Sequence, residues 1–226
     1  MLAAIVFDFD GVIANSEPLH LRAFQEALAE LHVALGDADY YERYLGYDDV
    51  GVFKAVSAER DLGWSSERIA LLVAAKAVRL EALERNGSVL FPGAADAIRR
   101  AESRAPLAIA SGALGPEIRR VLDRAGLTGA FRTIVSAEDT PVSKPAPDPY
   151  QLAVVRLSDA LREVIHPSRC VAIEDSHWGL QSARAAGLRT VAVAQTYDRR
   201  TLDEADLVIE SIAELDVNAL ERLCED

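Results

Sequence analysis

The chain has 226 residues, of which 50% are apolar, and a formal net charge of −12. This length suits one ordinary domain or a core with a smaller inserted unit, and the apolar share is enough for a buried core, which excludes a disordered chain. The negative field also excludes a nucleic-acid surface or an anionic-membrane surface, because those partners bind clustered Lys and Arg.

The sequence has no uncharged apolar run of about eighteen residues, and its first residues lack a basic leader and a cleavage site. Its two cysteines, Cys170 and Cys224, have neither disulfide-framework nor metal-binding spacing, which is typical of a reducing compartment. We therefore expect a soluble cytoplasmic protein with no membrane partner, present as a monomer or a weak homodimer.

The N-terminal part combines one strand with a block of helices. An apolar run at residues 3–9 ends at Asp10-Gly11 and predicts a buried first strand. From Pro18 the apolar positions recur at helical spacing. Helices are predicted at residues 18–32, 37–44, 48–61 and 66–85, with breaks at Gly46 and Gly63. Residues 16–88 thus form a helical unit.

The rest of the chain alternates between the two kinds of element. Helices are predicted at residues 94–104, 116–125, 148–161, 176–186 and from 217, and strands at 107–110, 133–135, 171–173, 190–194 and 207–209. This alternation implies right-handed crossovers and a parallel sheet covered on both faces, which the first strand must join. The predicted fold is α/β, a Rossmann-like doubly wound core of residues 1–15 and 89–226 with residues 16–88 inserted.

Polar residues follow four of the predicted strands. In an open parallel sheet, ligands bind at the carboxyl ends of the strands, so these are the positions to examine. The residues there are Asp8 and Asp10, then Ser111 with Gly112 and Ala113, then Lys144, then Glu174 and Asp175. A random set of surface loops is not expected to supply acids, a hydroxyl and an ammonium in so regular a register.

The acids predict a metal site. Asp8 and Asp10 are two residues apart, so in an extended strand both side chains point to the same side. Such close carboxylates repel each other unless they share a cation or a proton. A lone pair of this kind is also typical of a turn or a helix N-cap. Together with Glu174 and Asp175, however, the two aspartates offer the hard oxygen ligands that suit Mg²⁺ and a phosphate oxygen.

Four motifs, in this order, resemble those of the haloacid dehalogenase superfamily: DFDGV at residues 8–12, SGA at 111–113, KPAPD at 144–148 and EDS at 174–176. The similarity spans nearly the whole chain. The helical insertion after the first motif resembles the α-helical cap of the branch that contains β-phosphoglucomutase and phosphoglycolate phosphatase. The resemblance implies a Mg²⁺-dependent enzyme that takes a phosphoryl group from a small phosphorylated metabolite.

The resemblance also implies a role for each residue. Asp8 would attack phosphorus and become an aspartyl phosphate, and Asp10 would protonate the leaving oxygen and later deprotonate water. Ser111 would hold the phosphoryl oxygens together with the backbone N–H groups of Gly112 and Ala113, and Lys144 would neutralise charge. The Mg²⁺ would be held by Asp8, Asp10 through its backbone carbonyl, Glu174 and Asp175.

Each role has a structural alternative. Ser111 is expected to N-cap the following helix whether or not it binds phosphate. Lys144 is otherwise an exposed loop cation, and Glu174 is otherwise a residue behind the metal ligands. Ser176 is expected to N-cap the helix at residues 176–186 rather than to act in catalysis.

Two residues of the helical unit are further candidates for substrate binding. Lys76 shares the apolar stripe of its helix with Leu72 and Leu80, and a buried lysine needs a partner. It either reaches substrate or the Asp10 side, or it snorkels at the edge of the stripe. His20 resembles a histidine that the β-phosphoglucomutase branch keeps near the substrate, and is otherwise a cap or a solvated residue.

The sequence departs from the mutase pattern. β-Phosphoglucomutase carries an arginine for the second phosphate of its substrate, whereas the similar stretch here, residues 45–49, reads LGYDD. Leu114 and Gly115 also replace the Lys and Asn that follow the serine motif there. Hydrolysis of a small sugar phosphate or organic-acid phosphate is therefore favoured. The alternatives are a phosphosugar mutase, a haloacid dehalogenase, against which Asp10 argues, and a non-catalytic phosphometabolite-binding protein.

Overall fold

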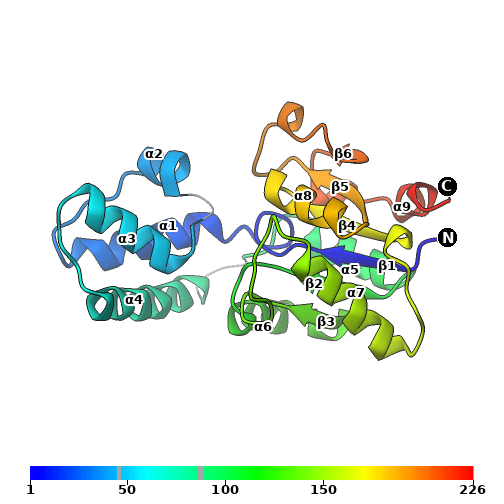
Figure 1. The fold of residues 1–226 in the computed structure, drawn as a ribbon, viewed down its shortest axis with the longest axis horizontal. Helices are drawn as coiled ribbons and strands as arrows, with labels where there is room; N and C mark the ends of the chain where they lie inside the picture. Colours follow the sequence, from blue (N-terminus) through cyan, green and yellow to red (C-terminus); the bar gives the residue numbers. More distant parts are fainter. Residues whose placement is uncertain (45–46, 86–88, 226) are drawn as a thin grey trace. The chain divides into compact units, whose positions relative to one another are not determined.

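The computed structural model describes residues 1–44, 47–85 and 89–225. The chain divides into two compact units, one formed by Met1–Asn15 with Val89–Asp226 and the other by Ser16–Ser88. We call the first the α/β unit and the second the helical unit (Figure 1). The predicted break at Gly46 and the expected second boundary at residue 88 lie outside the described residues.

A parallel sheet forms the centre of the α/β unit. Its strands are β1 (Ala4–Phe7), β2 (Leu107–Ala110), β3 (Phe131–Val135), β4 (Cys170–Glu174), β5 (Arg189–Val193) and β6 (Leu207–Ile209). They lie in the order β3-β2-β1-β4-β5-β6, and every neighbouring pair is parallel. All residues of β1, β2 and β4 are buried, as expected of strands covered on both faces. The predicted α/β fold is confirmed.

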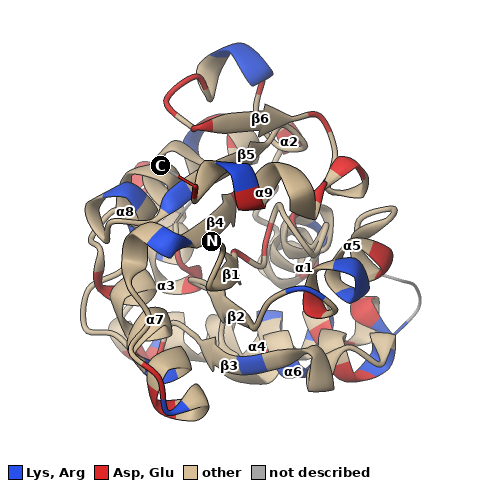
Figure 2. Cartoon of the chain, turned by 90° about the vertical axis from the view of Figure 1, so that its right-hand side faces the viewer, with Lys and Arg blue, Asp and Glu red and all other residues tan. Residues whose placement is uncertain are grey.

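Helices cover both faces of this sheet. They are α5 (Ala94–Glu102), α6 (Gly115–Ala125), α7 (Asp148–Leu161), α8 (His177–Ala185) and α9 (Val217–Leu223). Single 3₁₀ turns occupy Thr128–Ala130, Pro167–Arg169, Arg199–Thr201 and Ile212–Glu214. In the view of Figure 2, α7 and α8 lie on one side of the sheet and α5 lies on the other. Tyr150 and Leu157 of α7 are buried in one apolar cluster with Val6 and Ala172.

The helical unit has its own apolar core. Its helices are α1 (Glu17–Ala29), α2 (Asp37–Asp39), α3 (Asp49–Glu59) and α4 (Ser66–Glu84), with a π-helical turn at Tyr40–Tyr44. Phe24 and Phe53 pack edge to face in this core, with ring centroids 5.3 Å apart. The predicted helix at residues 37–44 is confirmed, with the difference that only its first three residues are α-helical and the rest form the π-helical turn. The wider π-helical turn keeps both Tyr40 and Tyr44 buried on one face.

Within the described ranges, none of the helices combines the length and the apolar character needed to cross a membrane.

Candidate active site

The pairing of β1 with β4 brings three carboxylates together. Phe7 lies opposite Ile173, so Asp8, which follows β1, comes next to Glu174 at the end of β4. The Asp8 N–H donates to the Ile173 carbonyl at 2.9 Å, which continues the ladder by one residue. Asp8, Glu174 and Asp175 are all buried, and each offers an oxygen within 4.8 Å of the others. Parallel pairing thus explains why residues so far apart in sequence form one acidic cluster.

Lys144 reaches this cluster from the loop between β3 and α7. Its Nζ lies 2.5 Å from Asp8 Oδ1 and 2.6 Å from Glu174 Oε1. The alternative of an exposed loop cation is wrong, because only 14% of the Lys144 side chain is exposed. Burial favours the neutral amine, but the carboxylates of Asp8 and Glu174 outweigh it and raise the pKa of Lys144. The side chain therefore stays an ammonium beside Asp8.

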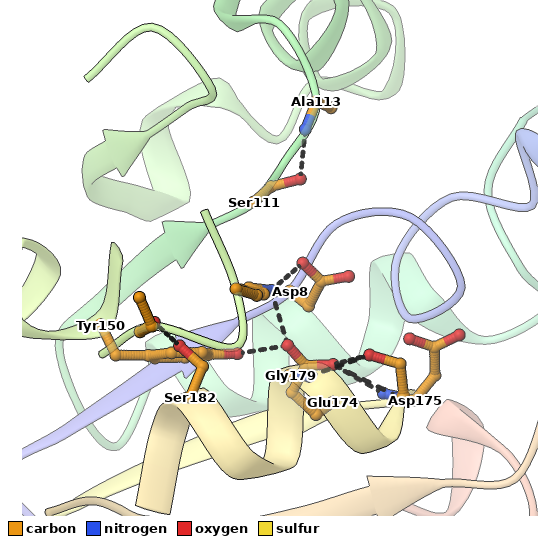
Figure 3. Close-up of polar contacts among 11 residues, drawn as sticks. Asp8, Ser111, Ala113, Tyr150, Glu174, Asp175, Gly179 and Ser182 are labelled. Carbon is orange, nitrogen blue, oxygen red and sulfur yellow. Dashed lines mark hydrogen bonds and ion pairs between the residues drawn. The ribbon is translucent and has the colours of Figure 1, made fainter. Parts of the chain in front are cut away.

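Glu174 is fixed by several donors at once (Figure 3). Its Oε1 accepts from Lys144 and, at 2.7 Å, from the Tyr150 hydroxyl, and its Oε2 accepts from the Asp175 N–H at 3.1 Å. Helix α8 also makes room for this carboxyl group at Gly179, where a Cβ would lie 1.9 Å from Glu174 Oε1. Only glycine at this position lets Glu174 keep its place.

Asp175 lies between Glu174 and the loop that follows β1. That loop turns at Gly11, which has a φ of +78°, and a Cβ there would lie 1.9 Å from Asp175 Oδ2. Burial, together with the Glu174 carboxylate, raises the pKa of Asp175 to about 7, although a hydrogen bond from Thr196 opposes the shift. The charge of the half-buried Asp10 raises it further, which shows that Asp10 also lies near this group.

Burial likewise raises the pKa of Asp8 well above its ordinary value, although Lys144 opposes this shift. Three buried carboxylates beside one ammonium leave an excess of negative charge, and such a cluster favours either a proton or a cation. All the donors are hard oxygen atoms. The residues therefore fit a divalent metal such as Mg²⁺.

Ser111 lies at the carboxyl end of β2, the strand beside β1. The prediction that it N-caps the next helix is wrong, because α6 begins at Gly115 with Leu114 as its N-cap. The Ser111 hydroxyl instead accepts the Ala113 N–H at 3.0 Å within the loop, as Figure 3 shows. The predicted N-cap at Ser176 is confirmed, since its hydroxyl accepts the Gly179 N–H at 3.1 Å.

The helical unit contains a polar cluster of its own around the buried Lys76. Lys76 is fully buried among the apolar residues of α4, so the snorkelling alternative is wrong. Its Nζ lies 2.8 Å from Asp49 Oδ1 and 2.9 Å from His20 Nδ1, and 4.8 Å above the ring of Phe24. Asp49, one of the acids noted in the sequence where a mutase has its arginine, is therefore the partner of this lysine.

His20 is held neutral in this cluster. Burial lowers the pKa of His20 to about 3, and the positive charge of Lys76 lowers it further. Because Lys76 can only donate, Nδ1 accepts and Nε2 carries the proton. His20 is half-buried, and its ring contacts Lys76 on the side of Nδ1. On the same helix, Glu17 accepts a hydrogen bond from the Tyr40 hydroxyl, and burial raises the pKa of Glu17.

Sequence reasoning missed several supporting residues. Tyr150 occupies the apolar stripe of α7, and its hydroxyl was not recognised as a partner of Glu174. Gln195 and Thr196 follow β5, and Gln195 Nε2 donates to the Gly11 carbonyl at 3.0 Å. The rule that selected the other strand ends would have found these two. The collision that excludes a side chain at Gly179 has no signal in the sequence alone.

Comparison with known proteins identifies the family of this chain. A family model described as haloacid dehalogenase-like hydrolase matches residues 2–187. Protein CbbY of Cupriavidus necator is 33% identical over 92% of this chain and 84% of its own length. Hexitol phosphatase B of Escherichia coli is 30% identical over 95% of this chain and 94% of its own length. CbbY of Rhodobacter sphaeroides, solved with xylulose-1,5-bisphosphate, is 31% identical with a TM-score of 0.80, over 95% of this chain and 96% of its own.

The fold and the site together define a hydrolase of phosphoric monoesters. The chain belongs to the haloacid dehalogenase-like hydrolase family, as the four motifs in the sequence predict. A β-phosphoglucomutase of Clostridium difficile shares the fold with a TM-score of 0.82 at 19% identity, over 99% of this chain and 97% of its own.

Proposed function

We propose that this protein is a Mg²⁺-dependent phosphatase that hydrolyses a small phosphorylated sugar or organic acid through an aspartyl phosphate on Asp8. The observation that carries the proposal is the position of Lys144, whose Nζ contacts the carboxylates of both Asp8 and Glu174. A buried ammonium beside a buried carboxylate opposes the rise in that carboxylate's pKa and neutralises the charge of an arriving phosphate.

Two displacements at phosphorus make up the reaction. In the first, an oxygen of Asp8 bonds to phosphorus while the bond from phosphorus to the alcohol oxygen breaks, and Asp10 gives that oxygen a proton. In the second, Asp10 takes a proton from water, whose oxygen bonds to phosphorus and releases Asp8. Lys144 offsets the phosphoryl charge in both displacements.

Three further groups of residues complete the proposal. A Mg²⁺ ion held by Asp8, the backbone carbonyl of Asp10, Glu174 and Asp175 would supply Lewis-acid neutralisation of the phosphoryl oxygens. Ser111 and the N–H of Gly112 would bind those oxygens by hydrogen bonds. The Ala113 N–H would join them if the Ser111 hydroxyl turns from it to the phosphate, since the two are bonded to each other here.

The polar cluster of the helical unit supports hydrolysis over mutase chemistry. We propose that His20 and Lys76 bind the non-reacting part of the substrate. Lys76 is already neutralised by Asp49, and His20 is held neutral. A second phosphate would therefore meet no net positive charge there, whereas the hydroxyl groups of a sugar would find donors and acceptors. Relatives named for fructose-1-phosphate and hexitol phosphates suggest the same substrate class.

A phosphate-release assay over a substrate panel tests this proposal. The panel contains fructose-1-phosphate, hexitol phosphates, 2-phosphoglycolate and xylulose-1,5-bisphosphate, each with Mg²⁺ and with EDTA. We expect Mg²⁺-dependent release from a sugar or organic-acid monophosphate, and its loss in Asp8→Asn. Full activity of Asp8→Asn would exclude the nucleophile. Turnover of a hexose phosphate to its isomer only with added sugar bisphosphate would identify a mutase instead.

A further inference from the structure

The hydroxyl group of Tyr150 lies in the interior of the α/β unit, against the carboxyl group that contacts Lys144. Tyr150 is in the first turn of α7 and is 0% exposed. Its hydroxyl donates to Glu174 Oε1 at 2.7 Å, and the same oxygen accepts from Lys144 at 2.6 Å. A buried phenol that packs like Phe but makes one hydrogen bond has a specific partner to hold.

The aromatic ring of Tyr150 contacts the same lysine. Lys144 Nζ lies 5.1 Å from the ring centroid, within cation–π range. Tyr150 therefore contacts Lys144 directly through its ring and indirectly through Glu174, as Figure 3 shows for the tyrosine and the glutamate. A phenol is neutral near pH 7, so the hydroxyl is a donor to the Glu174 carboxylate.

The loop that carries Lys144 has a second anchor. The hydroxyl of Ser182, which is fully buried on α8, donates to the Ala146 carbonyl at 2.5 Å. Helices α7 and α8 thus each supply one buried hydroxyl group to the part of the site that holds Lys144. Ser182 fixes the backbone of the loop, whereas Tyr150 acts on the end of the lysine side chain.

We propose that Tyr150 is a positioning residue, which holds Glu174 and the Lys144 ammonium in the place where that ammonium contacts Asp8. The inference rests on the proposed function, because it assigns Tyr150 an effect on the reaction only through Lys144. Without the hydroxyl, Glu174 Oε1 loses one of its two donors, so the carboxyl group and the Lys144 ammonium paired with it are held less firmly. The nucleophile then loses part of its electrostatic support, while substrate binding through other groups persists.

A double-mutant cycle between Tyr150→Phe and Lys144→Met tests this role. Phe keeps the ring and the core packing and removes only the hydroxyl. We expect Tyr150→Phe to lower kcat about tenfold, the usual effect of losing such a supporting hydrogen bond, with KM changed less than about twofold. Because Tyr150 acts through Lys144, the substitution should have no further effect on kcat in the Lys144→Met background.

A matched control is Val154→Ala, one turn further along α7 and buried in the same cluster. It should lower the melting temperature without changing kcat. An unchanged kcat in Tyr150→Phe, the same loss in the Lys144→Met background, or an equal loss of kcat in Val154→Ala would each overturn the inference. Full activity of Lys144→Met would instead refute the role of Lys144 in the proposed function, so the two failures are distinguishable.

Discussion

Replacing Lys144 with Met should destabilise the α/β unit in a way that depends on pH. The substitution removes the ammonium that contacts two carboxylates whose side chains are only 9% and 1% exposed, those of Asp8 and Glu174. Removing one partner of such a buried pair costs about 3–5 kcal/mol, because the remaining charge is left without compensation. A proton on Asp8 recovers part of this loss. We therefore expect the variant to be about 3 kcal/mol less stable than wild type at pH 8 in EDTA.

The sign of the pH dependence follows from the direction of the Asp8 shift. Burial already raises the pKa of Asp8 above its unfolded value, and Lys144 is the group that opposes this shift. Without Lys144 the pKa rises further, so the native variant holds a proton that the unfolded chain releases. The free energy of unfolding of the variant therefore decreases as the pH rises. The variant should be closer in stability to wild type at pH 5 than at pH 8.

Urea denaturation followed by circular dichroism at the two pH values measures this difference. Lys54→Met, which replaces an exposed lysine, is the control and should change the stability by less than about 0.5 kcal/mol. A Lys144→Met protein as stable as wild type, or one with the larger deficit at pH 5, would refute the electrostatic reasoning for this site.

Two further predictions concern the packing around Glu174 and the charge of His20. Gly179→Ala places a methyl group against the Glu174 carboxyl group. It should lower the free energy of unfolding by about 1–3 kcal/mol and remove most of the phosphatase activity. Gly129→Ala, where a Cβ meets no atom within 4 Å, should leave activity intact, and equal activity of the two variants would exclude the collision. His20 has a native pKa of about 3, so the unfolded chain takes up a proton below about pH 6.5 that the native state does not. The stability of wild type should therefore decrease as the pH is lowered through this range. Between pH 7 and pH 5, the melting temperature of His20→Gln should decrease less than that of wild type. Equal decreases in the two proteins would show that His20 is not responsible.

Most of the site residues that the sheet positions could be predicted from the sequence. Apolar runs of strand length and their alternation with helices identify a parallel sheet, and the carboxyl-end rule then selects Asp8, Lys144, Glu174 and Asp175. The three acids meet because β1 pairs with β4, which follows from the doubly wound order, and Lys144 joins them from the loop between β3 and α7. The helix at residues 148–161 also matches α7 at both ends, since its proline start and apolar period are strong local signals.

The remaining details depend on three-dimensional contacts that no local pattern contains. Ser111 pairs with the Ala113 N–H rather than capping α6, because the loop extends to Gly115 before the helix begins. Tyr150 has the spacing of a core residue, and nothing in the sequence distinguishes its hydroxyl as the partner of Glu174. The charge of Lys76 was recognised as needing a partner, but the choice of Asp49 depends on how α3 packs against α4.

The chemistry assigned to Asp8 can be measured directly. Protein mixed with a ³²P-labelled substrate from the panel and quenched in acid within one turnover should carry label on the peptide that contains Asp8, and the label should be absent in Asp8→Asn. Product formation by wild type with no labelled Asp8 peptide at any quench time, or with label on a different residue, would contradict the account.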